Sequence, residues 1–142
     1  MEAGTGKIVR MGSLELRFLV DETISDNMVM FEFIVPPNAR VPARHFHKSV
    51  DEAIYALDGV TTTTLGEQKH ELSAGQTLFV PRGVVHIHEN LSDKTARSLI
   101  VLSPGTIGRR YFEEMAVEIN GPGKPDPAKI KEIMLHHGLV PA

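Results

Sequence analysis

The sequence lacks cysteine altogether, and its 142 residues include no long apolar run. Without cysteine the chain can form no disulfide and has no thiolate nucleophile, so any metal ion must be held by imidazole and carboxylate groups. No segment approaches the ~20 consecutive apolar residues that a membrane-spanning helix needs. Residues 1–12 also lack the apolar stretch of a secretory signal. We therefore expect a cytoplasmic protein without a membrane partner.

A cluster of basic residues is also missing. Lys and Arg are scattered along the chain, whose formal net charge is −3, so nucleic acid is not an expected partner. Hydrophobic residues make up 42% and charged residues 23% of the chain, which is typical of a globular protein. Since domains commonly contain about 100–150 residues, we expect residues 1–142 to form a single domain.

Short apolar and β-branched runs dominate the chain from Gly12 to about Leu102. Gly, Pro, Asn or Asp interrupts these runs every eight to twelve residues or so, a rhythm typical of a β-sandwich or barrel. Asp58-Gly59 is a hairpin turn signal between two such runs. We therefore predict a mainly β fold, with a barrel over about residues 12–102.

The pattern changes after Leu102, where apolar residues recur at spacings of three and four. This periodicity predicts an amphipathic helix over about residues 106–118. A second helix is predicted over about residues 127–137, because Asp126 can cap its start and Gly138 can end it. The expected architecture is thus a β-barrel followed by two C-terminal helices.

The residues that carry chemistry are three histidines and one glutamate. His45 and His47 are two positions apart, so on a strand both imidazoles point to the same face. Glu52 follows after enough residues for a turn and a return onto the next strand, and His86 lies on a later strand. Together they predict a site of three nitrogens and one oxygen, with two coordination positions left open.

Two segments around these residues resemble the two motifs of the cupin superfamily, at the short separation typical of its microbial members. The first comprises His45, Phe46, His47, Glu52 and Gly59, and the second comprises Gly75, Pro81, Gly83, His86 and Asn90. The glycine that often opens the first motif is replaced by Ala39, beside which Asn38 tolerates the left-handed backbone that glycine would supply. The resemblance implies a double-stranded β-helix, or jelly-roll, barrel with metal ligation by His45, His47, Glu52 and His86.

Within the superfamily the chain resembles small single-domain cupins often described as quercetin-dioxygenase-like. This resemblance implies a metal-dependent dioxygenase-type oxidoreductase for a small, aromatic or enolisable substrate. Glu52, besides binding the metal, is then a candidate to accept the substrate proton. The cofactor is expected to be one divalent transition metal ion, and imidazole-rich sites suit Fe, Mn, Co, Ni, Cu or Zn. Two alternatives stay open: a non-redox metal enzyme such as an isomerase or lyase, and a small-molecule-binding cupin without turnover.

His88 shares the parity of His86, so it faces the same interior and is a second candidate catalytic residue, either as a proton shuttle or as a group that orients a ligand. Small cupins commonly pair through their sheets, so the resemblance also implies a homodimer. The segment from Leu14 to Val20 is one candidate edge strand for such pairing.

Overall fold

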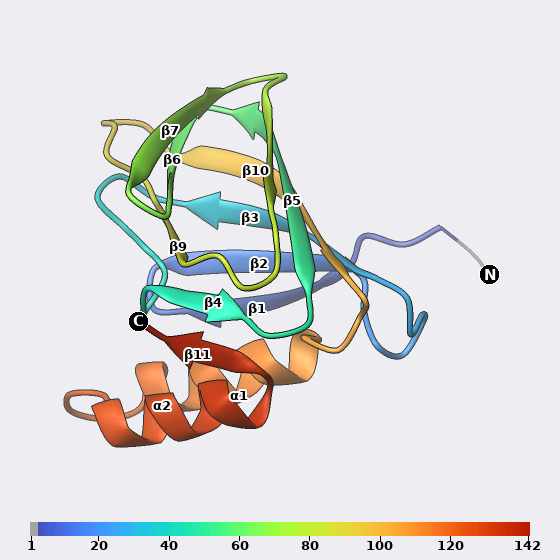
Figure 1. Cartoon of the computed structure of the whole chain (residues 1–142), viewed down its shortest axis with the longest axis vertical. Coiled ribbons are helices and arrows are strands. Elements are labelled where there is room, and N and C mark those ends of the chain that lie inside the picture. The colour runs from blue at the N-terminus through green and yellow to red at the C-terminus, as the bar shows by residue number, and fades with distance from the viewer. Residues whose placement is uncertain (1–2) are drawn as a thin grey trace.

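The computed structural model describes residues 3–142. Two antiparallel sheets face each other and enclose a barrel, and helices α1 and α2 lie beside one another against β1 and β11 at its lower side (Figure 1). The mainly β barrel with two C-terminal helices that the sequence predicts is confirmed. Among residues 3–142, no helix combines the length and the apolar character needed to cross a bilayer.

One sheet has six strands and carries most of the apolar core. Its strands lie in the order β1-β2-β3-β10-β5-β8. They are β1 (Lys7–Met11), β2 (Leu14–Val20), β3 (Val29–Val35), β10 (Ala96–Ser103), β5 (Asp51–Asp58) and β8 (Thr77–Val80).

The other sheet has five strands in the order β11-β4-β9-β6-β7. It carries three of the four predicted metal ligands and ends on the C-terminal strand. Its strands are β11 (Leu139–Pro141), β4 (His45–His47), β9 (His86–Glu89), β6 (Val60–Leu65) and β7 (Gln68–Ser73).

Strand β3 shows how the sequence pattern selects the barrel interior. Its burial alternates strictly along the strand, as expected where one face of a sheet covers a core. Val29, Phe31, Phe33 and Val35 are the buried set, each at most 5% exposed. The interior of the barrel is therefore apolar and aromatic beside β3.

The connections differ from the prediction at three points. Asp58-Gly59 does not form a hairpin, because β5 and β6 lie in different sheets and the chain turns a corner between them. Gly59 has a φ of +70° there, and a Cβ atom at this position would lie 2.5 Å from the carbonyl oxygen of Thr95. The segment Leu14–Val20 is not an edge strand either, since β2 is paired on both sides. Strands β1 and β11, at the ends of the chain, were not predicted.

The two helices lie close to their predicted positions. Helix α1 spans Arg109–Asn120 and α2 spans Pro127–His136. The carboxylate of Asp126 accepts a hydrogen bond from the amide of Ala128 and so caps α2, as the sequence suggests. Gly138 follows α2 with a φ of +83°, which lets the chain reverse directly into β11.

Candidate metal centre

The three-residue strand β4 supplies two imidazoles to the barrel interior. Its burial alternates, so the rings of His45 and His47 are buried on the inner face while Phe46 is half-buried on the other. The Nε2 atoms of the two histidines lie 3.2 Å apart. Nδ1 of His45 donates a hydrogen bond to the backbone oxygen of Ala43 at 2.7 Å. This bond leaves the Nε2 lone pair of His45 free to bind a metal ion.

His86 faces these two rings from β9, where it is the register partner of His45. Its Nδ1 lies 3.0 Å from the backbone oxygen of Val84, an arrangement that again directs the lone pair of Nε2 inward. Nε2 of His86 is buried without a hydrogen-bond partner. A buried nitrogen left unpaired in this way is costly unless it binds something, and an ion would satisfy it.

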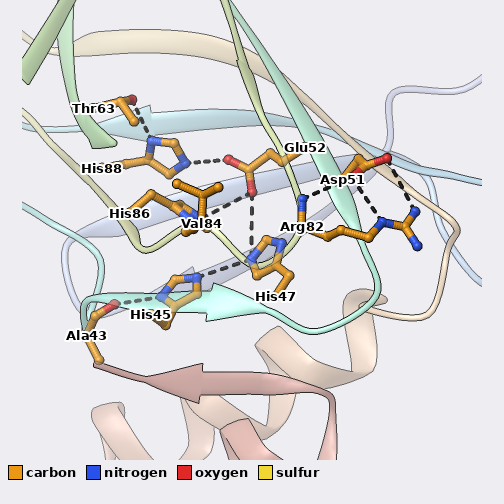
Figure 2. A network of polar contacts seen from close by, with 10 residues as sticks. All are labelled: Ala43, His45, His47, Asp51, Glu52, Thr63, Arg82, Val84, His86 and His88. Atoms are coloured by element: carbon orange, nitrogen blue, oxygen red, sulfur yellow. Dashed lines mark hydrogen bonds and ion pairs between the residues drawn. The ribbon is translucent and has the colours of Figure 1, made fainter. Parts of the chain in front are cut away.

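Glu52 completes the set from β5 in the opposite sheet, and only 5% of it is exposed. Its Oε1 atom lies 3.9 Å from Nε2 of His47 and 3.9 Å from Nε2 of His86. Figure 2 shows the three imidazoles and this carboxylate pointing toward one another. The four predicted ligands therefore converge, and their donor types suit a divalent transition metal ion at the usual ~2.0–2.2 Å bond lengths.

His88 lies beside the four converging residues and contacts Glu52. Nε2 of His88 is hydrogen-bonded to Oε2 of Glu52, the carboxylate oxygen that does not face His47 and His86. Nδ1 of the same ring lies 2.7 Å from the hydroxyl of Thr63 on β6. The structure thus places His88 in the interior, as predicted, where its ring bridges the carboxylate and a threonine hydroxyl (Figure 2).

The electrostatics of the site favour the protonation states that bind metal. Burial, followed by the nearby charge of His86, lowers the pKa of His45 to about 3. Burial likewise lowers the pKa of His86 to about 4 and lowers that of His47. Burial alone would raise the pKa of Glu52, but the charge and hydrogen bond of His88, then the other imidazoles, hold it below its ordinary value. Neutral imidazoles and an ionised carboxylate are the metal-binding forms.

A cavity of about 50 Å³ is lined by three of the four converging residues, His45, His47 and Glu52, and by His88. Strands of the barrel contribute aromatic and aliphatic side chains to the cavity wall, and helices α1 and α2 and strand β11 contribute further apolar side chains. No Lys or Arg occurs among the described residues that line it. The lining includes Leu16, Phe31, Phe33, Ile100, Leu102, Ile107, Tyr111, Phe112, Met115, Met134 and Leu139.

Asn90 and Gly59, two further residues of the motifs, have structural roles. The buried amide of Asn90 donates to the backbone oxygens of Val35 at 2.9 Å and Lys94 at 2.7 Å. Asn38 has a φ of +63°, so it supplies the left-handed backbone expected beside Ala39. The loop before β4 is joined to Asn90, which follows β9, by two backbone hydrogen bonds: the amide of Asn38 donates to the oxygen of Asn90 at 2.8 Å, and the amide of Asn90 donates to the oxygen of Ala39 at 2.9 Å.

Thr63 is a residue of the site that the sequence pattern did not reveal. It lies in the run Thr61 to Thr64, which strand propensity alone explains. The register of β6 against β9 places Thr63 directly opposite His88. All four threonines of this run are buried, each at most 9% exposed, so strand parity does not single out Thr63.

Two proteins of known names are similar to this chain. The polyketide synthase CurC of Streptomyces cyaneus is 31% identical over 71 residues, which cover 50% of this chain and 46% of CurC. The polyketide cyclase RemF of Streptomyces resistomycificus superposes with a TM-score of 0.62 at 29% identity, covering 72% of this chain and 77% of RemF.

A third relative has a different activity in its name. A sugar phosphate isomerase of the cupin superfamily from Silicibacter pomeroyi superposes with a TM-score of 0.60 at 23% identity, covering 66% of this chain and 60% of the isomerase. The chain thus spans less than two thirds of CurC and of this isomerase. The family model described as the cupin domain matches residues 31–102, half of the chain. With the fold and both motifs in place, the chain belongs to the cupin family.

Proposed function

We propose that the protein is a metal-dependent enzyme that acts on a flat, apolar, enolisable substrate of the polyketide kind. The observation that carries this proposal is that three imidazoles and one carboxylate, those of His45, His47, His86 and Glu52, converge beside an aromatic cavity. A phosphorylated sugar would call for several convergent Lys or Arg side chains. No such side chain occurs among the described residues of the cavity wall.

The similarity to CurC and RemF supports this substrate class, since both names refer to polyketide chemistry. The sugar phosphate isomerase, at 23% identity, shares the fold and supports no substrate. For the reaction we favour a non-redox ring closure. In such a step a carbon next to a carbonyl loses a proton and bonds to a second carbonyl carbon, whose oxygen takes up a proton. Loss of this hydroxyl group, together with a second proton from the attacking carbon, releases one water and leaves a carbon–carbon double bond.

The side chains of this chain supply the proton transfer for such a step. A divalent ion bound by His45, His47, Glu52 and His86 would supply Lewis-acid polarisation of a substrate carbonyl. His88 and Oε2 of Glu52 form a hydrogen-bonded pair next to the ligands, positioned to accept the proton from carbon and return one to the leaving oxygen. Phe31 and Phe33 on the cavity wall offer flat apolar surface to the substrate and exclude water.

A dioxygenase, the reaction implied by the resemblance to quercetin-dioxygenase-like cupins, is the second candidate. Four protein ligands leave coordination positions open on a six-coordinate ion, and the cavity of about 50 Å³ is large enough for a small diatomic molecule. Both candidates begin with removal of a substrate proton at the Glu52 and His88 pair. They differ in whether a second carbonyl or dioxygen then reacts with the substrate.

Mass spectrometry separates the two candidates. Protein loaded in turn with Fe, Mn, Co, Ni, Cu or Zn is incubated with 1,3-diketones, aromatic polyketones, flavonols and catechols, with and without oxygen. Loss of one water in the absence of oxygen supports ring closure, whereas gain of two oxygen atoms with matching oxygen uptake supports the dioxygenase. If the native protein forms products no faster than His45→Ala protein does, both proposed reactions are overturned. Tight binding of one of these compounds without product would favour the non-catalytic alternative.

A further inference from the structure

The last strand of the chain pairs with the strand that carries two of the metal ligands. In the register between β11 and β4, Leu139 lies opposite His47 and Pro141 opposite His45. A backbone hydrogen bond lies at each end of this pairing. The amide of Lys48 donates to the backbone oxygen of Gly138 at 2.9 Å, and the amide of Ala142 donates to the backbone oxygen of Arg44 at 2.9 Å. The pairing therefore extends over the whole of β4.

The alternation of an antiparallel ladder fixes what each residue of β11 does. Between the two flanking bonds, Val140 faces Phe46 as the next hydrogen-bonding pair. Pro141 falls at a position where no N–H is needed, which explains how a proline is accommodated in the strand. Val140 is thus the central backbone partner of β4.

The other side of β4 is held less extensively. Strand β9 pairs with β4 through the single register pair His45 and His86. One further bond, from the amide of Gly83, reaches the backbone oxygen of His47 at 2.8 Å. Since β4 has only three residues, most of its ladder is made with β11.

Strand β11 is also continuous with the wall of the cavity. It follows α2 after the reversal at Gly138, and Met134 on α2 and Leu139 on β11 are both buried and both line the cavity. The segment lies outside residues 31–102, the part of the chain that matches the cupin domain. Strand β4, which carries two of the candidate ligands, therefore pairs with a segment outside that match.

We propose that β11 is a positioning element of the metal centre, with Val140 as its key residue: its pairing with β4 fixes the backbone that aims the imidazoles of His45 and His47. The inference rests on the metal-binding part of the proposed function. It requires neither the substrate nor the reaction. Because the coupling is reciprocal, an ion bound by those imidazoles must in turn stabilise the pairing of β11 by the same factor.

The test measures binding of Co²⁺ alone by calorimetry and by its visible absorption spectrum. Val140→Pro removes the central N–H of β11 and is expected to weaken Co²⁺ binding by about tenfold or more, as for other residues that orient ligands. Lys7→Pro is the matched control, because it places a proline in β1, a strand that carries no candidate ligand and forms the edge of the six-stranded sheet. Its Co²⁺ affinity should equal that of the native protein.

A second measurement needs no variant and covers the case in which Val140→Pro fails to fold. In the native protein, Co²⁺ should slow amide hydrogen exchange of Val140 by more than it slows that of Val9 in β1. Any of three results would overturn this inference and leave the metal proposal intact. The native and Val140→Pro proteins could bind Co²⁺ equally well, Lys7→Pro could lose as much Co²⁺ affinity as Val140→Pro, or Co²⁺ could slow hydrogen exchange equally at the amides of Val140 and Val9. Native protein that binds no Co²⁺ would overturn the metal proposal as well.

Discussion

The hydroxyl of Thr63 lies 2.7 Å from Nδ1 of His88, across the imidazole from the carboxylate of Glu52. When Glu52 is ionised, Nε2 of His88 must carry the proton that the carboxylate accepts. In the neutral ring, Nδ1 then accepts a hydrogen bond from the Thr63 hydroxyl. The contacts with Thr63 and Glu52 thus define one tautomer of neutral His88. In this tautomer the ring proton is on Nε2, so His88 can pass a proton only to Glu52.

Thr63→Val should therefore destabilise the site without changing its shape. Valine keeps the branched side chain that suits a strand but removes the hydroxyl, so Nδ1 of buried His88 loses its partner. We expect the free energy of unfolding to fall by about 1–2 kcal/mol, measured by urea denaturation. Thr61→Val, two residues earlier on β6 and opposite Leu72, is the matched control. An equal loss in both variants would show that the contact with His88 contributes nothing specific.

His88→Gln should separate proton transfer from metal binding. The four converging ligands remain in this variant, so its metal content should match that of the native protein, whereas His45→Ala should lose the ion. Exchange of the central C–H proton of a 1,3-diketone with deuterated water, followed by NMR, should slow by about 100-fold or more in His88→Gln. Loss of metal from His88→Gln would instead identify His88 as a ligand, and unchanged exchange would remove it from the mechanism.

The buried imidazoles predict how the metal-free protein responds to acid. The pKa values of His45 and His86, about 3 and about 4 in the folded protein, lie below the ordinary value of 6.5. Between about pH 6.5 and pH 4 the unfolded chain therefore binds protons that the folded chain does not, so stability falls as the pH falls. Each such histidine can contribute a slope of up to about 1.4 kcal/mol per pH unit.

Urea denaturation of metal-free protein at several pH values measures this slope. His45→Gln removes one of the titrating groups and should give a shallower dependence over the same interval. Glu52 acts in the same direction at lower pH, because its lowered pKa makes its contribution disappear only as the pH falls below its ordinary value of 4.5. Stability that is constant between pH 6.5 and 4 would show that the rings are not buried in neutral form.

The convergence of the four candidate ligands was predictable because their signals are local. Parity along a strand places His45 and His47 on one face, and the turn residues before Glu52 and His86 bring each onto a strand near them. Thr63 was not predictable in the same way, since its contact with His88 depends on the register between β6 and β9. Register across a sheet is set by the assembled barrel and by no short run of sequence.

The fold shows the same division between local and non-local signals. Helix α2 has its cap and its stop within a few residues of its ends, and it forms close to where the sequence places it. Asp58-Gly59 has a strong turn signal, yet the strands on either side join different sheets because each finds a more distant partner. Strand β11 has three residues, too few for a periodic pattern. The homodimer stays a prediction, which the mass in solution tests.

The size of the cavity leads to a last prediction, about Phe112 on α1. Substrate pockets usually measure about 300–1,000 Å³, whereas this cavity measures about 50 Å³, so an aromatic substrate must displace part of its wall. The ring of Phe112 lines the cavity and packs against Phe18 and Phe31, at centroid distances of 5.6 and 5.4 Å. Removing this half-buried ring is the most direct way to enlarge the cavity from the helical side.

Phe112→Ala should bind a naphthol more tightly than the native protein does, because less of the wall has to move, while its Co²⁺ affinity stays the same. The lost packing should lower the free energy of unfolding by about 2–3 kcal/mol. Val117→Ala, at a position 77% exposed on the same helix, should change neither quantity. Calorimetric titration with catechol and with a naphthol gives the comparison. If both ligands bind the native and Phe112→Ala proteins equally well, the helices do not limit access, and the substrate must enter through another part of the barrel.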